Sequence, residues 1–338
     1  MKFYKIMFFM TMVLGTLISI SSYSWLGMWM GLEINMISIM PLFSNYKNMY
    51  TSEASIKYFI TQTLASMMIL FSIIIFSMNS CLNMNLNSFI LMMLNSALLT
   101  KMGAAPFHFW FPEVMEGLNW WNNLILLTWQ KIAPMVLIMY NSSFSLFFSI
   151  IIILCMMISS IMGFNQISLR KILTFSSINH IGWMISALLM SKTLWIFYFI
   201  IYTIISINII YIFSKFKMFF INQLISMLNY NSVMKLFFMM NFFSLGGIPP
   251  FIGFLPKWFV INQMILNNQI MLTFIMIIFT LLTFYFYMRI MFSSLIINFD
   301  SPMSMSTKKT KIKNLYMIMF NFFSLSSLIL FPLFFNFF

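Results

Sequence analysis

Long apolar runs alternate with short polar segments along almost the whole chain. Each run is about as long as the roughly 20 residues that a helix needs to cross the hydrocarbon core of a bilayer. Because lipid offers no partner for an unpaired backbone group, every crossing is expected to be helical. The pattern predicts eleven helices, at 3–20, 24–43, 54–77, 88–111, 122–140, 144–163, 170–190, 193–213, 235–262, 269–291 and 315–335. We therefore expect an all-α, multi-pass membrane protein.

The composition supports this fold class and leaves no room for a separate soluble domain. Hydrophobic residues make up 62% of the 338 residues and charged residues only 7%, too few to cover a water-facing surface. The first apolar stretch lacks a small-residue cleavage site, so residues 1–20 are interpreted as a retained helix rather than a signal peptide. Cys81 and Cys155 stand far apart, which predicts neither a disulfide framework nor a metal site.

The basic residues fall almost entirely on one side of the predicted helices. Fourteen lie in loops or near helix ends on the side of the N-terminus and Lys192 alone lies on the other, while Lys101, Lys131 and Lys257 cannot be placed at either surface. The positive-inside rule then places the N-terminus and the basic loop 292–314 in the cytoplasm or, in an organelle, the matrix. The net charge of +13 is thus a topology signal and gives no reason to expect nucleic-acid binding. The abundance of Phe and Met, 43 and 38 residues, points to an A+T-rich organellar gene.

Four charged residues lie deep within predicted helices: Glu33, Lys101, Lys131 and Lys257. Glu33 is roughly 15 Å from either end of its helix, too far for its short side chain to reach a headgroup. A charge at the bilayer centre costs from about 2.5 to well above 10 kcal/mol, so four of them imply a polar interior. Snorkelling or a structural ion pair with Glu33 is the alternative for each lysine, above all for Lys257 near a helix end.

Lysine suits proton transfer because burial disfavours its charged form and a nearby carboxylate favours that form again. A change in the distance between Glu33 and Lys101 would therefore make the lysine hold or release a proton. His180, in "LTFSSINHIGWM", is a candidate relay beside Ser176, Ser177 and Asn179, or equally a packing residue. For Glu113 and Glu116, in the loop expected after the fourth helix, solvation is the simpler interpretation.

Two of the predicted helices contain breaks. The first break is in "KMGAAPFHFW" at Gly103 and Pro106, with His108 after it; the second, in "LGGIPPF", contains Gly246, Gly247, Pro249 and Pro250. Proline removes a backbone donor and glycine tolerates the bend that results. Each break is either a kink that helps packing or irregular backbone that lines a polar path.

The positions of the breaks favour an ion path. They fall in the fourth and ninth helices, and an odd offset makes these helices run in opposite directions. We therefore expect one transmembrane domain, 1–338, with inverted repeats at 1–140 and 144–291 and a last helix at 315–335. In this architecture paired interrupted helices mark the path of the ion.

Motifs for redox or nucleotide chemistry are missing from the sequence. There is no GxGxxG turn, no P-loop and no cysteine cluster for iron–sulfur ligation. Two histidines on separate helices make a poor haem site. Any such chemistry that drives this chain is expected in partner subunits.

Six segments, in order, resemble the antiporter-like membrane subunits of respiratory complex I, the NADH:ubiquinone oxidoreductase, and the overall pattern resembles an insect version. They are "SWLGMWMGLEIN", "EASIKYFITQTLAS", "KMGAAPFHFWFPEVMEGL", "TWQKIAPM", "SSINHIGWM" and "LGGIPPFIGFLPKW". The resemblance covers residues from about 11 to 291. It implies that Glu33 pairs with Lys101, that Lys131 is a connecting site and that Lys257 is an exit-side site for protons.

The resemblance also implies an enzyme role only as a subunit. NADH, FMN, iron–sulfur clusters and ubiquinone would lie in partner subunits, with no cofactor in this chain. The expected neighbours are other membrane-arm subunits, including antiporter-like ones, and lipid, in the mitochondrial inner membrane with the N-terminus in the matrix. Bacterial members carry about three further N-terminal helices, so another subunit is expected to cover the N-terminal face.

Two other functions stay open. A stand-alone cation/proton antiporter would need its own ion site, yet Glu33 is the one acid within a predicted span. A structural membrane subunit would use its buried charges only for assembly.

Overall fold

The computed structural model describes residues 3–44, 48–82, 87–142, 145–228, 232–249 and 251–296. This part of the chain is helical apart from its connections and an isolated bridge between Ser168 and Phe220. The expected all-α fold is confirmed. The predicted helix 315–335 and the basic loop 292–314 lie wholly or mostly outside the described residues.

Eight helical segments of the described chain are long and apolar enough to cross a membrane. They are α1 (Phe3–Ser21), α2 (Trp25–Phe43), α3 (Met49–Leu82), α6 (Trp120–Leu127) with α7 (Trp129–Tyr140), α8 (Ser145–Gly163), α9 (Leu169–Met190), α10 (Lys192–Phe216) and α14 (Ile270–Ile296). These segments support a multi-pass membrane protein. The count of eleven is not confirmed and stays a prediction.

The remaining helices are shorter and include the broken ones: α4 (Asn87–Met102), α5 (Trp110–Gly117), α11 (Ile221–Leu228), α12 (Ser232–Gly246) and α13 (Phe254–Leu266). The span expected at 88–111 thus stops at α4 and resumes as α5, and the span expected at 235–262 is divided between α12 and α13. The short helix α11 falls where the sequence predicted a loop. Glu113 and Glu116, also expected in a loop, lie on α5.

The span expected at 122–140 has an irregular point at Thr128, between α6 and α7. Thr128 has φ −112° and ψ −70°, and its hydroxyl donates to the carbonyl of Leu124 at 2.7 Å. Such a bond back to the preceding turn competes with the helix and bends it. Pro134 adds to the effect, because it cannot donate to the carbonyl of Gln130.

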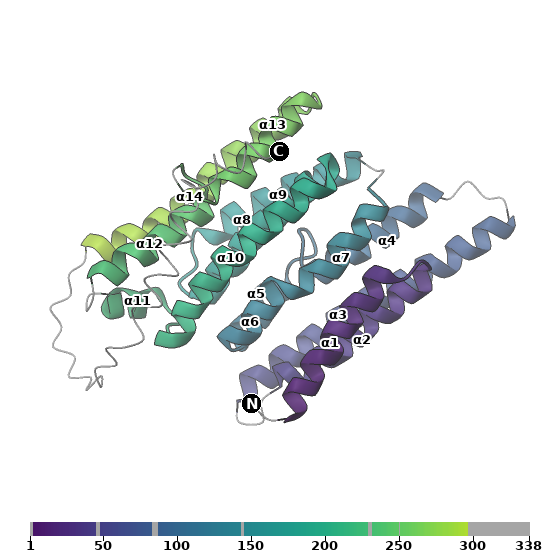
Figure 1. The fold of residues 1–338 in the computed structure, drawn as a ribbon, viewed down its shortest axis with the longest axis horizontal. Helices are drawn as coiled ribbons and strands as arrows, with labels where there is room; N and C mark the ends of the chain where they lie inside the picture. The colour runs from purple at the N-terminus through teal and green to yellow at the C-terminus, as the bar shows by residue number, and fades with distance from the viewer. Residues whose placement is uncertain are drawn as a thin grey trace, which may run out of the picture. The chain divides into compact units, whose positions relative to one another are not determined.

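The chain forms two compact units, residues 1–155 and 156–338. In the first unit α1, α2 and α3 pack in series, α3 packs on α4 and α5, and α4 packs on α7 (Figure 1). In the second unit α9 packs on α10 and α13, while α12 packs on α10 and α14. The predicted repeats 1–140 and 144–291 stay a prediction.

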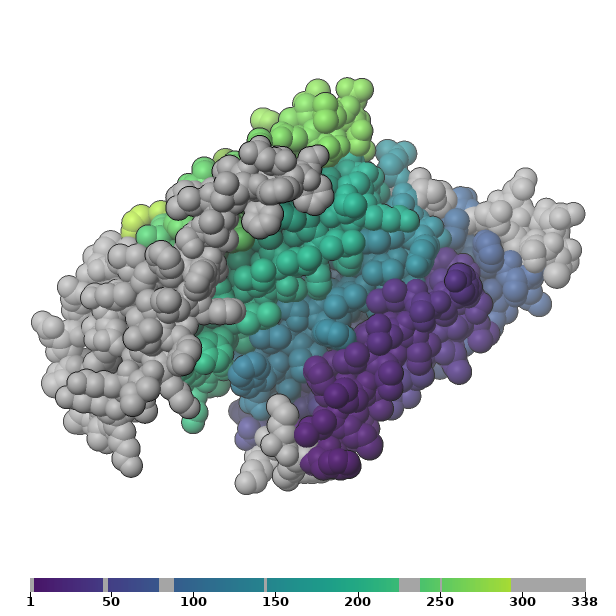
Figure 2. Space-filling view, in the orientation of Figure 1, coloured from purple at the N-terminus to yellow at the C-terminus, as the bar shows by residue number. Residues whose placement is uncertain are grey.

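Helices α1 and α9 show two kinds of membrane helix. Figure 2 shows α1 at the surface of the first unit, where Phe3, Met10 and Leu14 are exposed. In α9 every residue from Ile172 to Leu188 is buried, including serines, Asn179 and His180. An apolar outer face suits α1 to lipid or a partner, whereas the polar side chains of α9 are surrounded by protein.

Candidate functional site

Helix α4 ends where its backbone enters the left-handed region at Gly103, with φ 74°. The N–H of Gly103 donates to the carbonyl of Thr100 at 3.1 Å, and the N–H of Ala104 donates to the carbonyl of Leu99 at 3.0 Å. These two bonds form the Schellman motif that closes a helix C-terminus. The chain then runs irregularly to the start of α5 at Trp110.

Lys101 lies on the last turn of α4, and only 6% of its surface is exposed. Its amine has no hydrogen-bond partner among the described residues. Glu33 acts on it electrostatically, but no ion pair joins the two side chains. The structure therefore brings Glu33 into the electrostatic range of Lys101 without direct pairing.

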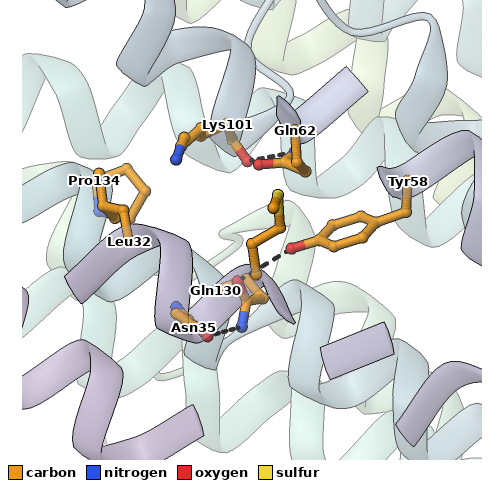
Figure 3. A pocket seen from close by; sticks show the side chains of 8 residues that line it. Leu32, Asn35, Tyr58, Gln62, Lys101, Gln130 and Pro134 are labelled. Carbon is orange, nitrogen blue, oxygen red and sulfur yellow. Dashed lines mark hydrogen bonds between the residues drawn. The ribbon is translucent and has the colours of Figure 1, made fainter. Parts of the chain in front are cut away.

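A small polar cavity lies beside Lys101 (Figure 3). Its space is about what one water molecule needs. The other residues that line it are Leu32, Asn35, Met36, Tyr58, Gln62, Gln130 and Pro134. The lining residues come from α2, α3, α4 and α7, so the cavity lies at the meeting point of four helices of the first unit.

Hydrogen bonds link the polar residues around the cavity into what we call the polar wall: Asn35, Gln130 and Tyr58. Gln130 donates through Nε2 to Asn35 Oδ1 at 3.0 Å and accepts through Oε1 from the Tyr58 hydroxyl at 3.3 Å (Figure 3). Sequence reasoning missed all three. The position of Gln130 next to Lys131 was the one available signal.

Lys131 lies on α7 with 1% of its surface exposed. Its Nζ is 6.0 Å from the centre of the Phe111 ring and lies in electrostatic range of the Cys155 thiol. That thiol is 3.8 Å from the carbonyl oxygen of Ala105, within the irregular segment after α4. The residues around Lys131 thus include the segment that forms the first break.

Two other groups predicted near the first break have less notable surroundings. His108 is buried, and its Nδ1 is 3.3 Å from the carbonyl oxygen of Pro106, to which it can only donate. Glu113 forms an exposed ion pair at 2.9 Å with Lys57, which is also 2.9 Å from Glu53. These surroundings agree with packing for the histidine and solvation for the carboxylate.

The second break repeats the backbone geometry of the first. Helix α12 ends at Gly246, and Gly247 has φ 78°. Its N–H donates to the carbonyl of Ser244 at 3.1 Å, and the N–H of Ile248 donates to the carbonyl of Phe243 at 3.3 Å. The offsets along the chain are the same as at Gly103, so the two helices end in the same motif.

Lys257 of α13 lies against this second helix end with 5% of its surface exposed. Its amine donates to the carbonyl of Gly246 at 2.7 Å and to that of Leu245 at 3.3 Å. The same Nζ is 5.9 Å from the centre of the Trp183 ring on α9. Pro249 lies exposed in the same irregular segment, and Pro250 lies outside the described residues.

His180 lies in a buried polar cluster of the second unit. Its Nδ1 is 2.9 Å from the hydroxyl of Tyr198, and its ring centre is 5.0 Å from that of Tyr202. The neighbouring Asn179 donates to the hydroxyl of Thr283 at 3.1 Å. The tyrosines, both on α10, were missed from the sequence because distance along the chain hides their contact with α9.

The helices bury four side chains that can bind a proton: Lys101, Lys131, His180 and Lys257. Three lysines and a histidine lie beside polar side chains, main-chain carbonyls or aromatic rings in helices of a membrane protein. Among the described residues no three His, Cys, Asp or Glu side chains come together as metal ligands do. Amine and imidazole groups can each bind and release a proton, which is the chemistry open to these buried side chains.

Comparison with known proteins identifies the family. Residues 22–284 match the transmembrane family described as NADH:quinone oxidoreductase/Mrp antiporter. The chain belongs to this family. The NADH:quinone oxidoreductase/Mrp antiporter match contains both breaks and all four charged residues predicted at depth.

Two mosquito proteins are similar to this chain over nearly their full length. NADH-ubiquinone oxidoreductase chain 2 of Aedes aegypti is 49% identical, over 96% of this chain and 96% of that protein. The protein of the same name from Anopheles gambiae is 47% identical, over 96% and 95%. A chain of the respiratory complex I structure from Thermus thermophilus has the same fold, with a TM-score of 0.80 at 21% identity, covering 87% of this chain and 71% of that one.

Proposed function

We propose that this chain is a core membrane subunit of proton-pumping NADH:ubiquinone oxidoreductase, in which buried lysines carry protons across the membrane. The observation that carries the proposal is the state of Lys101. Its amine is buried beside a polar cavity and the end of a broken helix, and it has no hydrogen-bond partner in the part of the chain that the structure describes. A charge placed in this way is costly for stability alone, and so favours a functional role.

Each charged residue has a proposed part in the path. Glu33 modulates Lys101 electrostatically, Lys131 connects the first group to the next, and Lys257 is the exit-side carrier. His180 is a relay candidate, supported by its contact of 2.9 Å with the Tyr198 hydroxyl.

The same proposal covers topology and partners. The protein is multi-pass in the mitochondrial inner membrane with its N-terminus in the matrix, as the distribution of basic residues indicates. In this proposal the redox reaction, with NADH, FMN, iron–sulfur clusters and ubiquinone, takes place in other subunits, and this chain carries no cofactor. Antiporter-like subunits are its membrane neighbours. The shared motif at Gly103 and Gly247 supports inverted repeats at 1–140 and 144–291.

The first experiment is native electrophoresis of gently solubilised membranes, with an in-gel NADH dehydrogenase stain and mass spectrometry of each band. Finding this chain in the large stained band supports the proposal. Finding it in a small band without NADH activity favours a stand-alone antiporter and removes the partner assignments.

The second experiment replaces Lys101 with Met in the assembled complex. We expect the yield of protons per NADH oxidised to fall while the complex still assembles. Lys192→Met is the matched control, because Lys192 is exposed at the start of α10 and its loss should leave the yield unchanged. A normal yield in assembled Lys101→Met complex would support the structural role instead.

A further inference from the structure

The amine of Lys257 is held between the end of α12 and a ring of α9. It donates to Gly246 and Leu245, the carbonyls of the last turn of α12, at 2.7 and 3.3 Å. The ring of Trp183 lies on another side, with its centre 5.9 Å from Nζ. We call these residues, with Gly247, the Lys257 cradle. Lys257 and Trp183 are both almost completely buried.

Gly247 is the part of the cradle that leaves room for the lysine. A Cβ added there would lie 2.8 Å from Cδ and 2.9 Å from Nζ of Lys257. Real Cβ atoms essentially never come so close to another heavy atom, so the lysine would have to move away. The glycine thus has two tasks, since its φ of 78° closes the helix and its missing side chain admits the amine.

The surroundings of the amine distinguish its charged form from its neutral form. An ammonium has three N–H donors and makes stronger hydrogen bonds to carbonyls than a neutral amine does. The C-terminus of a helix carries partial negative charge, and the face of an indole ring also attracts a cation. All of these interactions weaken when the lysine loses its proton.

We propose that Gly247 and Trp183 are positioning residues for proton transfer, which hold the Lys257 amine against the last turn of α12. The protonation of Lys257 is thereby linked to the closed end of the broken helix. This inference rests on the proposed function of Lys257 and adds to it the residues that place its amine.

The test uses the whole complex in inner-membrane vesicles and measures protons moved per NADH oxidised, together with the amount of assembled complex. In Gly247→Ala we expect assembled complex with a clear loss of proton yield per NADH oxidised, because displacing a reacting group by about 1 Å can slow its proton transfer about 100-fold. Trp183→Leu should also lower the yield. The Trp183→Phe variant should retain most of the proton yield, because phenylalanine keeps an aromatic face toward the amine.

A double variant separates positioning from backbone strain. If Gly247→Ala acts by moving the lysine, adding it to Lys257→Met should cause no further loss of proton yield. A further loss in the double variant would mean that strain acts independently, and would overturn the assignment of Gly247. If Gly247→Ala does not assemble, the comparison of Trp183→Leu with Trp183→Phe tests the proposal. Equal proton yields in these two variants would overturn the positioning role of the Lys257 cradle.

Lys257→Met alone tests the function on which the inference rests. A normal proton yield in that assembled variant would remove Lys257 from the proton path, and the cradle with it. A low yield in Lys257→Met with normal yields in Gly247→Ala and Trp183→Leu would leave the path in place and overturn the positioning role alone.

Discussion

The two helix breaks share one backbone motif and use their lysines in opposite ways. At the first, Lys101 belongs to the helix that ends, and its amine has no hydrogen-bond partner within the described ranges of the chain. At the second, Lys257 comes from the following helix and donates to two carbonyls of the helix end. Beside the same backbone motif, Lys101 therefore lines a cavity, whereas Lys257 is hydrogen-bonded to the backbone of the helix end.

The carbonyls at the first break have neutral donors instead. Trp110 donates through Nε1 to the carbonyl of Thr100 at 3.1 Å, and Gln62 donates through Nε2 to the carbonyl of Lys101 at 3.4 Å. The end of α4 is thus satisfied whatever the charge of Lys101. The carbonyls at the end of α12 accept from Lys257, so the gain or loss of a proton by this lysine also changes the hydrogen bonds at the helix end.

The largest expected effect is a difference in stability between Lys257→Met and Lys101→Met. Lys257→Met removes the amine from one buried carbonyl and one partly buried carbonyl and should destabilise the protein by about 3 kcal/mol, since a hydrogen bond to a charged group contributes about 1.5 to 3. Lys101→Met removes a buried charge with no direct partner and should be neutral or stabilising. Thermal inactivation of the two assembled variants measures the difference, and equal losses would remove the contrast between the breaks.

Gln130→Leu should have the next largest effect and destabilise the protein by about 2 kcal/mol. The Tyr58 hydroxyl and the Asn35 amide then lose their shared partner beside the cavity. The proton yield should fall as well, if the polar wall serves Lys101. Gln263→Leu, at an exposed position of α13, is the matched control for thermal inactivation and yield. Similar behaviour of both variants would mean that the polar wall plays no special part.

Trp110→Phe should destabilise the protein less than Gln130→Leu does, by about 1 kcal/mol, because it removes one neutral hydrogen bond from the end of α4. Trp121→Phe is the control, since Trp121 is 59% exposed. Thermal inactivation of the assembled variants should be faster in Trp110→Phe alone. Equal rates of inactivation would indicate that Thr100 finds another donor.

The smallest effect is expected for Lys57→Met. Its ion pairs with Glu53 and Glu113 are exposed, and such pairs contribute little because water and salt screen them. The rate of thermal inactivation should change very little. In high salt the difference from the unmodified protein should be smaller still. A clear loss of stability that salt does not reduce would show that this link between α3 and α5 matters more than its exposure indicates.

The fold was predictable wherever a single property of the sequence decides the structure. Apolar length places most helices to within a few residues, and the Gly103 and Gly247 segments are visible as breaks because glycine and proline oppose a regular helix. The start of α3 shows the limit. This helix begins at Met49, five residues before the expected 54, because Thr51, Ser52 and Glu53 interrupt the apolar pattern near its start.

The candidate site was predictable only in part. Charge at depth identifies Lys101, Lys131 and Lys257 as candidates, since burying a lysine in a membrane helix is costly and lysines found there usually serve a function. Gln130, Tyr58 and Trp110 gave no comparable signal, because amide, phenol and indole groups are common in membrane helices. The donation from Lys257 to α12 also needs the structure, as the sequence does not say toward which helix end the side chain turns.

The burial of α9 has a consequence for how the protein is made. Its Ser176, Ser177, Asn179 and His180 all lie within protein, and released alone into lipid they would lack most of the partners that they have in the folded unit. Two helices that pack on it, α10 and α13, are synthesised later. Helix α9 is therefore expected to remain at the insertion machinery, or with an assembly factor, until these later helices arrive. We therefore expect α9 to enter the lipid together with α10 and α13, and not by itself.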